Sequence, residues 1–96
     1  MFDKPRTFAR ELANQFESDF PPTLQTLSGR KTIDMYSKAL GRLKTRAGEV
    51  QRIERYGIVA RIVLARSFQS AMQEKSYHAD VLRQSTSELA SALTFA

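Results

Sequence analysis

Cysteine is absent from this 96-residue sequence, and histidine occurs once, at position 78. Without cysteine the chain cannot form the disulfides or thiolate metal sites on which many small domains depend. A chain of this length also buries only a modest fraction of its surface on folding. We therefore predict one small domain over residues 1–96 that enlarges its core by oligomerisation. The lack of cysteine also fits a reducing compartment.

Long apolar runs are lacking as well. The most apolar stretch, residues 58–65, is interrupted by Arg61 and is far shorter than the roughly 20 residues that a membrane-spanning helix requires. Residues 1–6 carry charge and a proline where a secretory signal would carry its apolar segment. We therefore expect a cytoplasmic protein without a membrane span.

Residue patterns that support catalysis or metal binding are also scarce. Glu74 and His78 are spaced one helical turn apart, but two ligands do not close a metal site. Ser76 and Asp80 flank His78, yet neighbours along one helix point in different directions and form no catalytic triad. Residues 29–32, GRKT, resemble the end of a phosphate-binding loop but lack its upstream glycine and preceding strand. We expect no enzyme activity, metal, cofactor or small-molecule substrate; the alternative is an enzyme with an arginine-lined site for an anionic metabolite.

Positive charge is concentrated in the middle of the chain. Residues 30–66 contain ten lysines and arginines against three acidic residues, a net charge of +7, whereas residues 1–29 and 67–96 each carry −1. Such a block attracts phosphates, anionic lipids or acidic protein surfaces. These cations are solvated or pair with acidic side chains beside an apolar seam, contact nucleic acid, or lie against a membrane surface. In the second case the expected phosphate-contacting residues are Lys38, Arg42, Arg46, Arg52 and Arg55.

Apolar residues at helical spacing predict a helix over about residues 3–20. Its apolar stripe has one member every four residues, and Asp3 is the expected N-cap. The members of this stripe are Phe8, Leu12, Phe16 and Phe20. Pro21 and Pro22 then end the helix, because proline cannot continue it, and residues 21–31 form a connection.

Residues 32–56 show a heptad-like pattern that predicts a second helix. Six apolar residues are spaced alternately by three and four positions: Ile33, Tyr36, Leu40, Leu43, Ala47 and Val50. Thr32 is the expected N-cap, and Gly57 is expected to mark the end of the helix. The pattern indicates packing against another helix, in a second copy of the chain or in a partner.

Residues 58–94 are predicted to form one or two further helices. The stretch 58–68 is apolar on more than one side, which indicates a central helix with several neighbours. Its β-branched residues leave a strand as the alternative. Residues 85–88, STSE, match a capping box and predict a restart of the terminal helix.

The sequence therefore predicts an all-α fold, either a helical hairpin or a small three- to four-helix bundle, dimeric through heptad-like packing. The expected function is non-enzymatic protein–protein interaction or assembly, as an adaptor, chaperone-like factor or regulator. The expected interface with a second copy or a helical partner consists of Phe8, Leu12, Phe16, Phe20, Leu40, Leu43 and Val50. The alternative is a small basic nucleic-acid-binding protein that uses residues 30–66.

Overall fold

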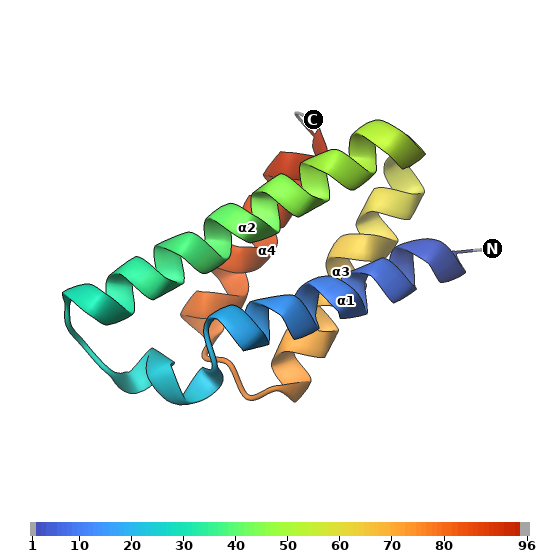
Figure 1. Cartoon of the computed structure of the whole chain (residues 1–96). Helices are drawn as coiled ribbons and strands as arrows, with labels where there is room; N and C mark the ends of the chain where they lie inside the picture. The colour runs from blue at the N-terminus through green and yellow to red at the C-terminus, as the bar shows by residue number, and fades with distance from the viewer. Residues whose placement is uncertain (1, 95–96) are drawn as a thin grey trace.

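A computed structural model describes residues 2–94, which form four α-helices and one short 3₁₀ helix, with no strand among them. The elements are α1 (Asp3–Asp19), η1 (Pro22–Thr26), α2 (Arg30–Glu54), α3 (Ile58–Glu74) and α4 (Ala79–Thr94), coloured in chain order in Figure 1. The predicted all-α bundle is confirmed. The strand alternative for residues 58–68 is wrong, because this stretch lies within α3.

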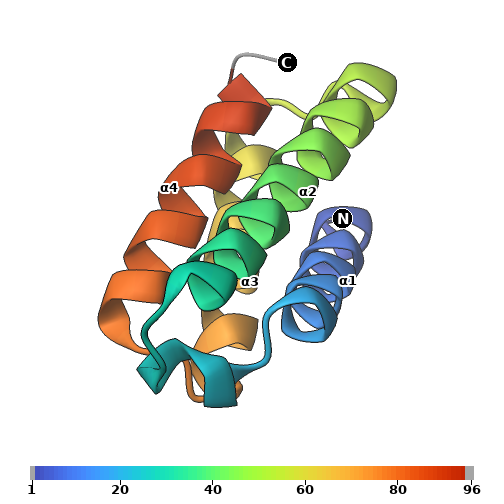
Figure 2. The ribbon, with the colours of Figure 1, turned by 60° about the vertical axis from the view of Figure 1, so that its left-hand side comes forward.

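The four helices pack as a bundle in which α2 and α3 each contact both α1 and α4. Figure 2 shows α1 and α4 on opposite sides of the other two helices. Helix α2 has 25 residues, against 16 or 17 in the other three. At 1.5 Å per residue it is about 12 Å longer than they are, so its ends extend beyond the common core.

Both apolar stripes predicted from the sequence are buried inside this one chain. Phe8, Leu12, Phe16 and Phe20 face Leu40, Leu43 and Ala47 of α2 and the inner sides of α3 and α4, which contribute Leu64, Phe68, Met72, Leu89 and Leu93. The heptad pattern begins later than predicted. Ile33, its first member, is 65% exposed, because the first turn of α2 extends past the core.

An aromatic cluster closes one end of the core. The ring of Phe16 makes edge-to-face contacts with Phe20, Tyr36 and Tyr77, with centroids 6.2, 6.3 and 5.6 Å apart. Such pairs stabilise beyond the area that they bury. Phe16 is therefore the residue through which α1, α2 and the α3–α4 turn are held together.

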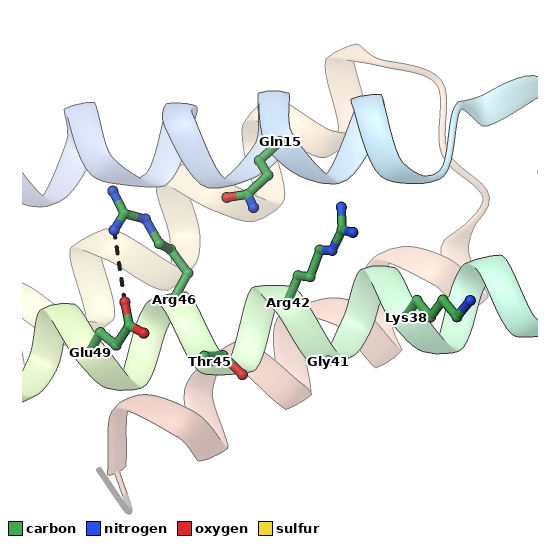
Figure 3. A pocket seen from close by; sticks show the side chains of 7 residues that line it. All are labelled: Gln15, Lys38, Gly41, Arg42, Thr45, Arg46 and Glu49. Atoms are coloured by element: carbon green, nitrogen blue, oxygen red, sulfur yellow. Dashed lines mark ion pairs between the residues drawn. The ribbon is translucent and has the colours of Figure 1, made fainter.

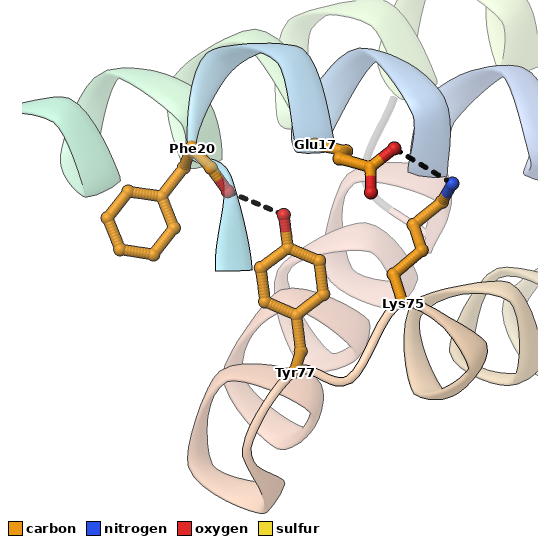
Figure 4. A network of polar contacts seen from close by, with 4 residues as sticks. All are labelled: Glu17, Phe20, Lys75 and Tyr77. Atoms are coloured by element: carbon orange, nitrogen blue, oxygen red, sulfur yellow. Dashed lines mark hydrogen bonds and ion pairs between the residues drawn. The ribbon is translucent and has the colours of Figure 1, made fainter. Parts of the chain in front are cut away.

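Polar contacts join the end of α1 to the turn between α3 and α4 (Figure 4). The Tyr77 hydroxyl donates a hydrogen bond to the carbonyl oxygen of Phe20, and Lys75 Nζ lies 3.1 Å from Glu17 Oε1. The buried hydroxyl satisfies a carbonyl that the end of α1 leaves without a helical partner. These two contacts hold the turn that precedes α4 against the end of α1.

Tyr77 also makes the stability of the fold decrease at alkaline pH. Burial, reinforced by the charge of Glu17, raises the pKa of the Tyr77 hydroxyl well above its ordinary value of 10.0. Above pH 10 the unfolded chain therefore loses this proton while the folded chain keeps it, and stability falls by about 1.4 kcal/mol per pH unit for each such proton.

We expect Tyr77→Phe to be less stable at pH 7 by about 1–3 kcal/mol, because the Phe20 carbonyl loses its partner.

Urea unfolding at neutral pH and at several values above pH 10 tests this role of Tyr77. The decline in stability with pH should be shallower in Tyr77→Phe than in the wild type. Part of it should persist, because burial also raises the pKa values of Tyr36 and Tyr56. An unchanged slope would contradict the role of Tyr77.

The ends of α2 differ from those predicted. The helix begins at Arg30, before Thr32, and its N-cap is Gly29 with φ 134°, a conformation that favours glycine. At the other end Arg55 adopts the left-handed conformation, with φ 51°. Gly57 is the N-cap of α3 and does not end α2.

Two other predicted caps are also wrong. Helix α1 begins at Asp3 itself, which lies in the first turn and makes no side-chain cap bond. There its negative charge is favoured by the helix dipole. The expected capping box at residues 85–88 lies inside a continuous α4. The buried Ser85 hydroxyl donates to the Val81 carbonyl oxygen at 2.7 Å and so bonds back along its own helix.

Candidate docking surface

The residues predicted to contact a partner lie in the core of the single chain. Six of the seven are buried, with exposed fractions from 1% to 9%: Phe8, Leu12, Phe16, Phe20, Leu40 and Leu43. The seventh, Val50, is partly buried against the same cluster. In this bundle the two stripes cover one another, so their buried members present no apolar face to a second molecule, and the interface predicted from the sequence stays a prediction.

The residues predicted to contact phosphate are divided between two places. Lys38, Arg42 and Arg46 follow one another at intervals of four along α2 and line a shallow groove of about 490 Å³ over α1. Arg52 and Arg55 lie beyond this groove, in the last turn and at the C-cap of α2.

Two of the three groove cations are engaged within the chain. Figure 3 shows Arg42 and Arg46 pointing toward α1. Arg42 Nη1 lies 2.7 Å from Asp19 Oδ1. Arg46 Nη1 lies 3.9 Å from Glu49 Oε2, and the Arg46 guanidinium carbon lies 5.9 Å from the centre of the Phe8 ring. Within residues 2–94, Lys38 forms no ion pair. The groove therefore carries less uncompensated charge than its sequence suggests.

Glu74 and His78 do not share a helical face. Glu74 is the last residue of α3, and His78 follows a turn in which Ser76 has φ 69°. Over the described part of the chain, no three histidine, aspartate or glutamate side chains are grouped so that they could hold a metal ion.

A cluster of exposed aliphatic residues surrounds the turn between α2 and α3. Ile53, in the last turn of α2, is 78% exposed, and Ile58, Val59 and Ile62, at the start of α3, are 69%, 60% and 49% exposed. We call these four residues the corner patch. The sequence signal for it is the apolar character of residues 58–68 on several sides, which predicts a central helix with several neighbours.

Part of the corner patch continues into a groove between α3 and α4. This groove, of about 280 Å³, is lined by Ile58, Arg61, Ile62, Ala65, Ala90, Leu93 and Thr94. Residues 55–73 contain three arginines and no acidic residue. Of the cations around the patch, Arg52, Arg55 and Arg61 form no ion pair within the described residues. The acidic Glu54 beside Ile53 pairs with Lys4. The surface is thus apolar at its centre, and the charges around it are mainly basic.

Among residues 2–94, no helix is both long and apolar enough to cross a bilayer. Comparisons of this chain with protein-family models, with curated proteins and with solved structures found no match.

Proposed function

We propose that this chain is a non-enzymatic interaction protein that binds another protein through the corner patch. The observation that carries the proposal is a complete core beside exposed aliphatic side chains on α2 and α3. Burying one such side chain contributes about 1.5–3 kcal/mol, and exposed apolar clusters commonly mark interaction sites.

Helix α3 supports this proposal because it is apolar toward the core and also toward solvent. Its inner side carries Leu64, Phe68 and Met72, all with 0% exposure, as a helix in a bundle requires. The side facing solvent would ordinarily be polar. In the first half of α3 this side carries the exposed Ile58, Val59 and Ile62 beside Arg61, whereas in the second half the exposed Gln69 follows Ile62 on the same face after two turns. The exposed apolar surface is therefore confined to the start of α3 and the neighbouring end of α2, as expected of a docking site.

The dimer predicted from the sequence needs a different interface from the one first assigned to it. Because most of the heptad residues lie in the core, self-association of the folded bundle would use another surface, and the corner patch is one exposed aliphatic candidate. The cytoplasmic location likewise remains a prediction from the sequence.

Photo-crosslinking from position 62 tests the proposed surface. A photoreactive amino acid at this position should give a discrete crosslinked product in cells, and Ile58→Asp in the same chain should remove it. Position 33 is the matched control, since Ile33 is also an exposed isoleucine but lies at the other end of α2. The same product from both positions, or none from position 62, would contradict a docking role for the corner patch.

A second candidate function is nucleic-acid binding along the groove between α1 and α2. The observation that favours it is the alignment of Lys38, Arg42 and Arg46 along one side of α2. If these cations neutralise three phosphates, affinity for duplex DNA should fall roughly 40-fold between 50 and 200 mM salt, because the bound counterions are released.

Fluorescence anisotropy with a labelled duplex measures this salt dependence. The double variant Lys38→Gln/Arg42→Gln should bind more weakly and with a shallower dependence on salt. Arg83→Gln, on α4 and outside this groove, is the control. No binding at low salt, or the same dependence in the double variant, would exclude this function.

A further inference from the structure

We infer that the corner patch binds an acidic amphipathic helix of a partner protein, which inserts apolar side chains between α3 and α4 and places carboxylates against the surrounding arginines. This inference rests on the proposed docking function and specifies the chemistry of the partner.

The groove has the features of a helix-binding site. Ala65 and Ala90 contribute only methyl groups and leave room between α3 and α4, while Ile58, Ile62 and Leu93 line the space beside them. Ile58 and Ile62 are one helical turn apart, so they can contact apolar residues spaced by three or four positions on a partner helix. The recess therefore suits protruding apolar side chains.

The charge around the groove selects an acidic partner. Arg61 is half-buried and lines the groove itself, and Arg55 and Arg66 precede and follow it in a stretch of 19 residues without any acidic residue. Arginine forms bidentate hydrogen bonds with carboxylates, and complementary charge raises both association rate and specificity. Arg61 is therefore the residue expected to set the charge preference.

A second copy of this chain fits the surface less well than such a helix. In a two-fold dimer the same patch meets itself, so the arginines of one copy would face those of the other. Glu54, which follows Ile53, pairs with Lys4 at 3.7 Å, and residues 55–73 contain no acidic side chain that could offset this repulsion. The chain as a whole carries +5. The charge pattern therefore favours a different molecule.

A bilayer also fits less well. A helix that lies on a membrane presents an apolar face along its length. In α3 the outward face is apolar only near its start and continues as the exposed Gln69 and Gln73. The apolar part is also recessed between two helices, whereas a bilayer offers no side chain to fill a recess.

Two synthetic helical peptides test the inference with the full chain. Both carry the same leucine face, but one has a glutamate-rich polar face and the other a lysine-rich one. By fluorescence anisotropy the acidic peptide should bind about tenfold more tightly or better, a difference of at least 1.4 kcal/mol. Ile62→Asp should abolish this binding and Ile33→Asp should not. Circular dichroism should show that both variants, changed at exposed positions, remain folded.

Arg61→Glu tests the charge preference separately from the apolar contacts. This variant should bind the acidic peptide at least about tenfold more weakly and the basic peptide more tightly than the wild type does. Equal binding of both peptides by the wild type, with loss in Ile62→Asp, would overturn the acidic partner while leaving the docking surface in place.

Binding to a membrane or to a second copy of the chain would also overturn the inference of an acidic helical partner. Binding to phosphatidylserine vesicles but to neither peptide would assign the patch to a membrane, and self-association removed by Ile62→Asp would assign it to a second copy. Failure to bind either peptide, with no effect of Ile62→Asp on any association, would overturn both the acidic partner and the proposed function.

Discussion

Replacing Leu40 and Leu43 together by alanine should remove most of the stability of the fold. Their exposed fractions are 9% and 3%, and both belong to the core of the single chain. Each such truncation costs about 2–5 kcal/mol, so the pair costs about 4–10 kcal/mol. The total stability of a domain of this size is about 5–14 kcal/mol. Urea unfolding should therefore show that most of the stability is lost, and far-UV circular dichroism should show a reduced helical signal.

The matched control is Ile58→Ala/Ile62→Ala, which also shortens two aliphatic side chains but at positions 69% and 49% exposed. It should keep the helical spectrum and most of the wild-type stability, because exposed side chains lose little on truncation. If instead the Leu40/Leu43 variant stays folded and loses only an association, these residues would form an interface between molecules, as the sequence first suggested.

Phe16→Ala should produce the largest loss of stability of any single substitution by alanine in α1. The ring is 1% exposed and contacts three other aromatic rings. Removing it creates a cavity where α1, α2 and the α3–α4 turn meet, at a cost of about 3–5 kcal/mol. The melting temperature should fall by more than about 12 °C, since each kcal/mol shifts it by about 4–8 °C in a domain of this size.

Differential scanning calorimetry measures this shift. Phe16→Leu, which keeps most of the apolar volume, should lose less stability than Phe16→Ala. Ile53→Ala, at a position 78% exposed, should lose almost none. A loss in Phe16→Ala as small as that in Ile53→Ala would contradict the central place of the aromatic cluster.

The helices were predictable because apolar periodicity marks one face of each element. The Phe8–Phe20 stripe and the positions Leu40, Leu43 and Ala47 are all buried, as the spacing predicts. Spacing does not say what covers a face, however. A heptad pattern looks the same whether its partner is another molecule or α4 of the same chain, so the sequence could not assign these residues to a core or to an interface.

The candidate surface was less predictable. The apolar residues of α3 were visible in the sequence, but which of them face solvent depends on the positions of α1 and α4. Similarly, the intervals of four among Lys38, Arg42 and Arg46 could have revealed their alignment. The ion pair of Arg42 with Asp19 could not be foreseen, because it joins residues 23 positions apart on two helices.

The most direct test of whether the apolar stripes are buried within one molecule is urea unfolding of the wild-type chain. It is measured at protein concentrations that span two orders of magnitude. A self-contained bundle has a midpoint that does not change with protein concentration. If folding required a second copy, the midpoint would rise with concentration, by about 1.4 kcal/mol of apparent stability per tenfold increase. A constant midpoint is the result expected of the monomeric bundle, and a rising one would contradict it.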